Sequence, residues 1–167
     1  MLLPYFGLTL LVLVTDQLLK AIVQAVMEPF QSVPVLKNIF AITYVRNYGA
    51  AFGVLPSQTW LLIALSLGVI IFVWVNRPKL RHHSLVFQIG LALALGGALG
   101  NLVDRVRLGY VIDFLDFHFW PVFNLADTAI VIGVGLIIIG LYHAENRERN
   151  KESAPDQACG PAGKEEL

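Results

Sequence analysis

Residues 109–127 read GYVIDFLDFHFWPVFNLAD and lie between two long apolar runs. The stretch carries three aspartates, Asp113, Asp116 and Asp127, and one histidine, His118. Burial among large apolar side chains disfavours the charged form of a carboxyl group, so raised pKa values are expected here. Two such groups held close together could share one proton and act on water as acid and base. The alternative is that these aspartates cap a helix or form structural ion pairs, which also perturb pKa values.

The composition around this stretch is that of a membrane protein. Of the 167 residues, 56% are hydrophobic and 14% are charged, whereas a soluble domain has about 25% charged residues. The length suits one compact domain, and the net charge of zero gives no indication of a nucleic-acid partner. The lone cysteine, Cys159, cannot form an internal disulfide, so it does not indicate a redox compartment.

Four apolar runs are long enough to span a bilayer, which takes a helix of about 20 residues. The spans are predicted at residues 2–26, 57–75, 84–103 and 122–143. The first run has no basic residue before Lys20 and no small-residue cleavage site after it, so we interpret it as a retained helix and not a signal peptide. Asp16 and Lys20 lie four residues apart on one face of this helix, where an ion pair is the preferred interpretation. Charges inside a membrane are costly, so that face is expected to point into the bundle.

The segments between and after these helices differ in composition. Residues 29–56 contain prolines and many β-branched and aromatic residues, which favours short strands and a small sheet at the membrane surface. Gly96 and Gly100 in the third helix have the spacing that allows two helices to approach closely. Residues 145–167 are charged and lack aromatic residues, so they are predicted to be a disordered tail after a membrane domain of residues 1–144.

The positions of Lys and Arg predict the orientation, because these residues concentrate in cytoplasmic loops. Three follow the second helix within five residues and three lie just after the fourth, while the segments after the first and third helices hold two each. Both termini are therefore predicted to be cytoplasmic. The strand-rich segment and the stretch at 109–127 should then share the outer face.

Several kinds of catalytic site are missing from the sequence. It contains no zinc-protease motif, no serine nucleophile elbow and no phosphate-binding glycine loop, which leaves the aspartates as acid–base groups. Asn124 is a strong helix N-cap and Asp127 suits the positive helix N-terminus, so capping alone could explain Asp127. If the preceding loop folds back, Asp113 can meet Asp127 and the two would titrate as a pair. Arg105 could pair with the adjacent Asp104 or donate to a substrate.

Asp113, Asp116 and His118 could also hold a metal ion, although we prefer a membrane-interface role for the histidine. Two further functions stay open on the residues alone. One is a proton-coupled carrier in which buried aspartates relay protons. The other is a metal-dependent lipid-processing enzyme that uses these three side chains.

Five short motifs lie in order along the apolar part of the chain. They are Asp16-Gln-Leu-Leu-Lys20, Asn47-Tyr-Gly-Ala-Ala-Phe-Gly53, Gly96-Gly-Ala-Leu-Gly-Asn101-Leu-Val-Asp104-Arg105, Val111-Ile-Asp113-Phe and Phe123-Asn124-Leu-Ala-Asp127. Together they resemble the lipoprotein signal peptidases (signal peptidase II), over the whole chain except the tail. The motifs show no departure from the family pattern.

The resemblance implies an aspartic endopeptidase of the bacterial inner membrane, with four transmembrane helices and a small periplasmic β-cradle between helices 1 and 2. Its substrates would be prolipoproteins in the membrane, cut just before a cysteine that carries a diacylglyceryl group, and no metal or cofactor would be needed. Asp113 and Asp127 would be the catalytic pair. The residues that would bind substrate or support the site are Asn47, Gly49, Asn101, Arg105, Asn124, Asp16 and Lys20.

Overall fold

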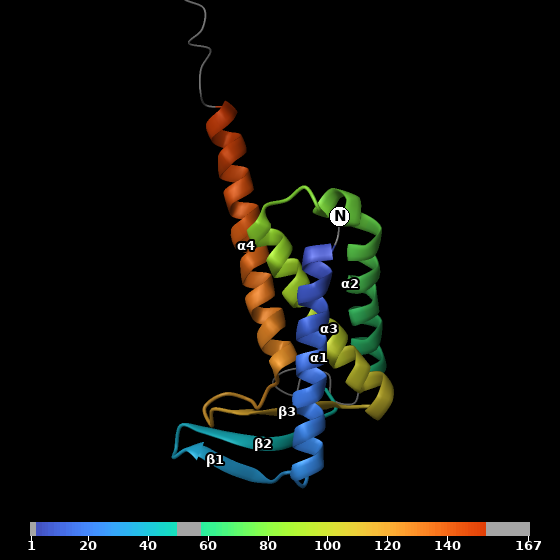
Figure 1. Cartoon of the computed structure of the whole chain (residues 1–167), viewed down its shortest axis with the longest axis vertical. Coiled ribbons are helices and arrows are strands. Elements are labelled where there is room, and N and C mark those ends of the chain that lie inside the picture. The colour runs from blue at the N-terminus through green and yellow to red at the C-terminus, as the bar shows by residue number, and fades with distance from the viewer. Residues whose placement is uncertain (1–2, 50–57, 153–167) are drawn as a thin grey trace, which may run out of the picture.

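Four long helices stand side by side and a small sheet covers one end of them (Figure 1). The computed structural model describes residues 3–49 and 58–152. The helices are α1 (Leu3–Val26), α2 (Thr59–Leu80), α3 (Leu85–Leu108) and α4 (Leu125–Glu152), and the strands are β1 (Ser32–Leu36), β2 (Phe40–Asn47) and β3 (Val111–Asp116). All four helices are long and apolar enough to cross a membrane. The predicted α-helical membrane fold, with a small sheet between the first two helices, is thus confirmed.

The outward faces of the helices are apolar, as contact with lipid requires. Leu18, Ile71 and Val131 each leave more than half of their surface exposed. In water such a surface would favour association, because contiguous exposed apolar patches are uncommon on soluble monomers. In a bilayer it is the expected exterior.

Three helices continue further than their apolar runs predicted. The second ends at Leu80 and the third at Leu108, where Gly109 takes a left-handed conformation and its N–H bonds to the carbonyl of Arg105. Glycine is the usual residue at such a helix end. The fourth helix runs to Glu152, because Glu, Arg and Lys are good helix formers and extend it past the apolar run. The rest of the predicted tail, residues 153–167, lies outside the described residues.

The sheet has three antiparallel strands in the order β1-β2-β3. Its first two strands come from the segment predicted to contain strands. The third comes from the stretch at 109–127, which was predicted to be a loop that folds back. β3 pairs with β2, so that Ile112 lies opposite Arg46 and Asp113 lies opposite Val45. A bulge in β2 follows between Ile42 and Val45. The sheet therefore joins the connection after α1 to the connection after α3.

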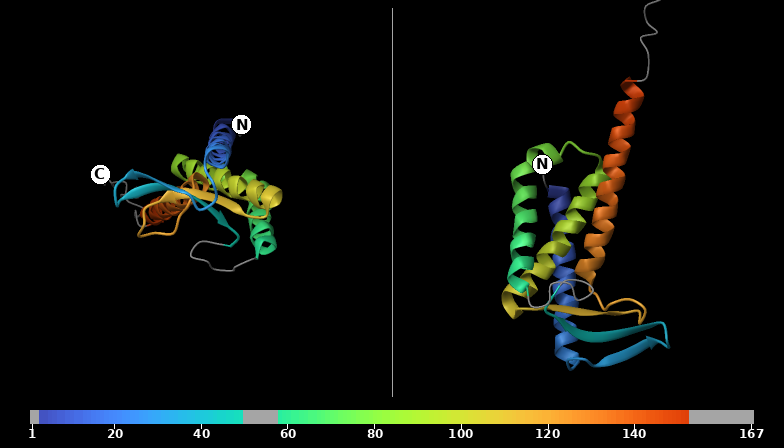
Figure 2. Two further views of the ribbon diagram at one scale, coloured as in Figure 1. Left: turned by 90° about the horizontal axis from the view of Figure 1, so that it is seen from below. Right: turned by 180° about the vertical axis from the view of Figure 1, so that it is seen from behind.

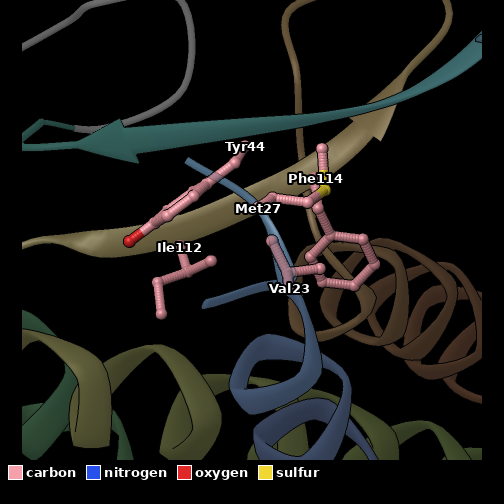
Figure 3. Packing of buried hydrophobic residues seen from close by; sticks show 5 residues of the cluster. All are labelled: Val23, Met27, Tyr44, Ile112 and Phe114. Carbon is pink, nitrogen blue, oxygen red and sulfur yellow. The ribbon is translucent and has the colours of Figure 1, made fainter. Parts of the chain in front are cut away.

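A small hydrophobic core attaches this sheet to the end of α1. Val23 of α1 and Met27, just after the helix, pack against Tyr44 of β2 and against Ile112 and Phe114 of β3 (Figure 3). Burial of large apolar side chains stabilises a folded protein by roughly 1.5–3 kcal/mol each. The core thereby fixes β3, and the residue between Ile112 and Phe114, relative to the helices.

Glycines let α3 pack closely against two other helices. A Cβ added to Gly96 or Gly100 would collide with α1, and at Gly100 it would lie 2.6 Å from a carboxylate oxygen of Asp16. The same addition to Gly97 would collide with the carbonyl of Ala126 in α4. The predicted close packing at the first two glycines is therefore confirmed. Viewed from the sheet side, α3 lies between α1 and α4, under the strands (Figure 2).

Candidate active site

Asp113 occupies the middle of β3 and is almost completely buried, with 1% of its surface exposed. Its Oδ1 accepts a hydrogen bond of 2.6 Å from the side-chain amide of Asn124. Its Oδ2 accepts one of 2.9 Å from the amide of Asn47 in β2. Strand pairing brings Asn47 to this position, since the last residues of β2 lie opposite the first residues of β3.

Asp127 lies in the first turn of α4 and does cap the helix. Its Oδ2 accepts from the backbone N–H of Asn124 at 3.3 Å, and Asn124 Oδ1 accepts from the backbone N–H of Asp127 at 2.9 Å. This reciprocal pair is a capping box. The other oxygen, Oδ1, accepts a hydrogen bond of 2.7 Å from the amide of Asn101 in α3. The capping role and the proximity to Asp113 thus occur together, because Asn124 bonds to both aspartates.

The environment of Asp113 favours its protonated form. Burial raises the pKa of the Asp113 carboxyl to about 7, and the nearby carboxyl of Asp127 acts in the same direction. Hydrogen bonds from Asn47 and Asn124 act against this rise by stabilising the ionised form. Near neutral pH the two carboxyl groups can therefore share one proton, which is what acid–base work on a water molecule requires.

A buried ionic cluster supports the pair from α1. The ammonium group of Lys20, 1% exposed, lies 2.8 Å from a carboxylate oxygen of Asp16 and 2.8 Å from one of Asp104. It also donates to Asn101 Oδ1 at 3.0 Å. The predicted ion pair of Asp16 and Lys20 is confirmed. The contact of Asp104 with Lys20 was not predicted, because α1 and α3 meet only through tertiary packing.

Arg105 does not pair with Asp104, which was one of its two predicted roles. Its guanidinium donates to the backbone carbonyl of Gly49 at 3.3 Å and is close enough to Asp127 and Asp113 to interact with both electrostatically. The backbone N–H of Gly49 donates in turn to the side chain of Asn47. Arg105 therefore holds the turn after β2 beside the two aspartates. The rest of the motif that begins at Asn47, residues 50–53, lies outside the described residues.

Asp116 and His118 form a separate contact at the far end of β3. Asp116 accepts from the hydroxyl of Thr43 at 2.7 Å and from the backbone N–H of His118 at 2.8 Å. Burial acts to raise the pKa of Asp116, but these hydrogen bonds outweigh it and hold that pKa below its ordinary value. Asp113 lies three strand positions away with other partners, so the three predicted metal ligands do not come together. Across the described residues, no three His, Cys, Asp or Glu side chains are placed as ligands of one metal ion.

Two polar contacts that the sequence analysis missed tie α1 to the site. Gln17 donates to Asp104 Oδ1 at 2.9 Å, and the other oxygen of Asp104 accepts from the backbone N–H of Ile112 in β3. Asp16 accepts from the backbone N–H of Ala126, near the start of α4. In the sequence, the signal for these contacts was the placement of three polar residues, Asp16, Gln17 and Lys20, close together in an apolar helix.

Comparison with known proteins shows what the chain is similar to. The family profile described as signal peptidase (SPase) II matches residues 8–143. The lipoprotein signal peptidase of Halothermothrix orenii is 46% identical over 136 residues, which is 81% of this chain and 93% of that protein. The lipoprotein signal peptidase of Moorella thermoacetica is 48% identical over 131 residues, covering 78% of this chain and 87% of its own.

Solved structures agree with these sequence relatives. A bacterial membrane enzyme determined by the in meso method at 2.3 Å resolution superposes with a TM-score of 0.79 at 30% identity, over 93% of this chain and 94% of that one. A second, determined at 1.9 Å resolution, gives a TM-score of 0.74 at 34% identity, over 82% and 91% of the two chains.

Proposed function

Since this chain belongs to the signal peptidase II family of aspartic peptidases, which remove signal peptides from prolipoproteins, we propose that Asp113 and Asp127 are its catalytic pair. The observation that carries this proposal is the bridge through Asn124, which hydrogen-bonds to both aspartates. Family membership favours peptide hydrolysis over the carrier and the lipid-processing enzyme considered above.

In the proposed reaction the pair holds one proton. The ionised carboxyl takes a proton from a water molecule as the water oxygen attacks the scissile carbonyl, and the protonated carboxyl donates its proton to the carbonyl oxygen, which gives a gem-diol. The first carboxyl then donates its proton to the leaving amine while the second takes a proton back from a gem-diol hydroxyl, so the C–N bond breaks, the new carboxyl product forms and the pair again holds one proton. A pKa of about 7 for Asp113 supports this cycle, because a group that titrates near neutral pH can both hold and release a proton.

We propose that the amides of Asn47, Asn101 and Asn124 hold the two carboxyl groups in position. Arg105 and Gly49 lie on the side of the pair where β2 ends and would contact the peptide. The cut falls before a cysteine that carries a diacylglyceryl group. This lipid keeps the substrate in the bilayer, so hydrolysis has to occur at the membrane surface. The site lies where the helices meet the sheet, which supports that arrangement (Figure 1).

The proposed orientation puts this end of the protein on the periplasmic side of the bacterial inner membrane. The end of α2, whose last turn carries Arg77 and Lys79 and is followed by Arg81, lies at the opposite end of the bundle from the sheet, as the right panel of Figure 2 shows. Short basic loops are retained in the cytoplasm. Both termini would then be cytoplasmic.

Mass spectrometry of a diacylated prolipoprotein incubated with the purified protein tests the proposed pair. Asp113→Asn and Asp127→Asn should each abolish cleavage, because each removes a group that transfers a proton. Asp116→Asn is the matched control and should keep most activity, since Asp116 bonds to Thr43 and His118 at the other end of β3. The assignment is wrong if either of the first two variants cleaves normally, or if Asp116→Asn is equally inactive. Activity is expected to survive chelation.

A further inference from the structure

The buried ammonium group of Lys20 has all of its hydrogen-bonding capacity in use. Its nitrogen contacts one oxygen each of Asp16, Asp104 and Asn101, at 2.8, 2.8 and 3.0 Å. A lysine ammonium has three N–H donors and no acceptor. Because every donor has its own acceptor, the position of the group is fixed from three directions. Two of these partners are carboxylates, while the third is a neutral amide that also contacts the proposed catalytic pair.

This third contact determines which way the amide of Asn101 faces. Its oxygen accepts from Lys20 at 3.0 Å and from the amide of Asn124 at 3.1 Å. Its nitrogen is then left to donate to Asp127 Oδ1, at 2.7 Å. A reversed amide would place N–H groups against the ammonium and an oxygen against the carboxylate, which loses both interactions.

We infer that Lys20 is a positioning residue for the proposed reaction: through Asn101 it fixes the hydrogen bond that Asp127 accepts, and it places a buried positive charge one side chain away from the Asp113–Asp127 pair. The inference rests on the proposed catalytic pair and assigns a role to a residue that does not touch it. Lys20 reaches Asp127 through one intervening side chain, Asn101.

Several charged groups face the Asp113–Asp127 pair, and they differ in whether they also contact the amide of Asn101. Lys20 and Asp16 come from α1, Asp104 and Arg105 from α3, and the pair itself from β3 and α4. Arg105 is positive but bonds to Gly49, so it leaves the amide of Asn101 unaffected. Asp16 bonds to the same ammonium as Asp104 but makes no contact with Asn101 that would orient it. The net charge near the pair and the orientation of the Asn101 amide can therefore be changed by different substitutions.

Three variants of the full-length protein separate the two roles. Lys20→Met removes the positive charge and the bond to Asn101, Asp16→Asn removes one negative charge, and the double variant restores the net charge without restoring the bond. Cleavage of a diacylated prolipoprotein peptide is measured as kcat and KM across the pH range in which the pair titrates. The melting temperature of each purified variant serves as the folding control.

Opposite shifts of the pH profile are expected. The profile of Lys20→Met should move to higher pH by about half a unit, because the positive charge of Lys20 favours the ionised form of Asp113. This shift is smaller than the roughly one to three units that an adjacent charge causes. Asp16→Asn should move it to lower pH. The double variant should regain the wild-type profile but keep a kcat reduced by roughly ten- to a hundredfold, with KM little changed, since the Asp127 hydrogen bond stays misplaced.

Each result has a distinct meaning. Profiles that keep the wild-type midpoints in all three variants would overturn the role of Lys20, even if activity fell, because damage to the fold lowers a profile without shifting it. A double variant with wild-type kcat would overturn the positioning role. If Asp113→Asn cleaved normally, the proposed pair itself would fail, and this is measured independently of Lys20.

Discussion

Asn124 shows how much one side chain contributes to this site. Its backbone N–H and its side-chain oxygen form the cap of α4 with Asp127, and its side-chain nitrogen donates to Asp113. Capping needs only the oxygen, whereas holding Asp113 needs the nitrogen. These two functions of one amide can be separated by an isosteric substitution.

Asn124→Asp should keep the helix cap and lose catalysis. Aspartate caps a helix about as well as asparagine, so any fall in the melting temperature should come from the buried nitrogen, which also donates to Asn101 and Ile112, and not from the cap. It cannot donate to Asp113 unless it is protonated, so kcat should fall by roughly a hundredfold, as for other misplaced reacting groups. Thermal unfolding and a peptide cleavage assay measure the two effects.

Asn38→Asp provides the matched control. Asn38 lies in the exposed turn between β1 and β2, with a positive φ that asparagine and aspartate both tolerate. This variant should keep both stability and activity. A large drop in the melting temperature of Asn124→Asp with unchanged kcat per folded molecule would contradict the separation of roles.

At the scale of elements, the sequence predicted the helices better than the sheet. A transmembrane helix is visible in the length of one apolar run, because its backbone hydrogen bonds are all internal to the segment. The pairing of β3 with β2 is not visible in this way: Asn47 and Asp113, which meet in the site, are 66 residues apart. The bulge between Ile42 and Val45 also sets the register, and no local pattern reveals it.

The same distinction holds for the site. The motifs name Asp113 and Asp127, which we propose as the catalytic pair, and the ion pair of Asp16 and Lys20 could be predicted within one helix. The contacts of Lys20 with Asp104 and of Arg105 with Gly49 could not, since each joins two elements whose relative position depends on packing.

The packing of α3 against α4 gives a prediction at this scale. Gly97→Ala should lower the free energy of unfolding by about 1–3 kcal/mol, the usual cost of overfilling a packed interface, because the new methyl group meets the Ala126 carbonyl and lies 2.8 Å from Ile130. Thermal unfolding in detergent measures the loss. Gly135→Ala in α4 is the control, since a Cβ there meets nothing within 4 Å. Equal stability of the two variants would show that the close contact at Gly97 is not required.

For the whole molecule, the two ends of the bundle differ in charge and chemistry. The aspartate pair and the sheet lie at one end, and the basic last turn of α2 with its short connection to α3 lies at the other (Figure 1). This asymmetry predicts one orientation in the membrane. The single native cysteine makes the prediction simple to test.

Cys159 should be inaccessible to a membrane-impermeant maleimide in sealed spheroplasts and should react after the membrane is permeabilised, because the predicted tail is cytoplasmic. In a Cys159→Ser background, a cysteine introduced by Ser32→Cys in the exposed strand β1 should react in sealed spheroplasts. The reverse pattern of labelling would mean that the site faces the cytoplasm.

The way the sheet is assembled has a consequence for the biogenesis of the protein. During synthesis β2 emerges early, but the strand that completes its edge comes only after α2 and α3 have been made. An unpaired strand edge is prone to wrong pairing. The β1-β2 hairpin therefore has an unpaired edge until β3 has been made. Any chain interrupted before β3 would be both inactive and prone to aggregate. The two aspartates proposed as the catalytic pair also come together only when α4 has been made, since Asp127 lies in the first turn of that helix.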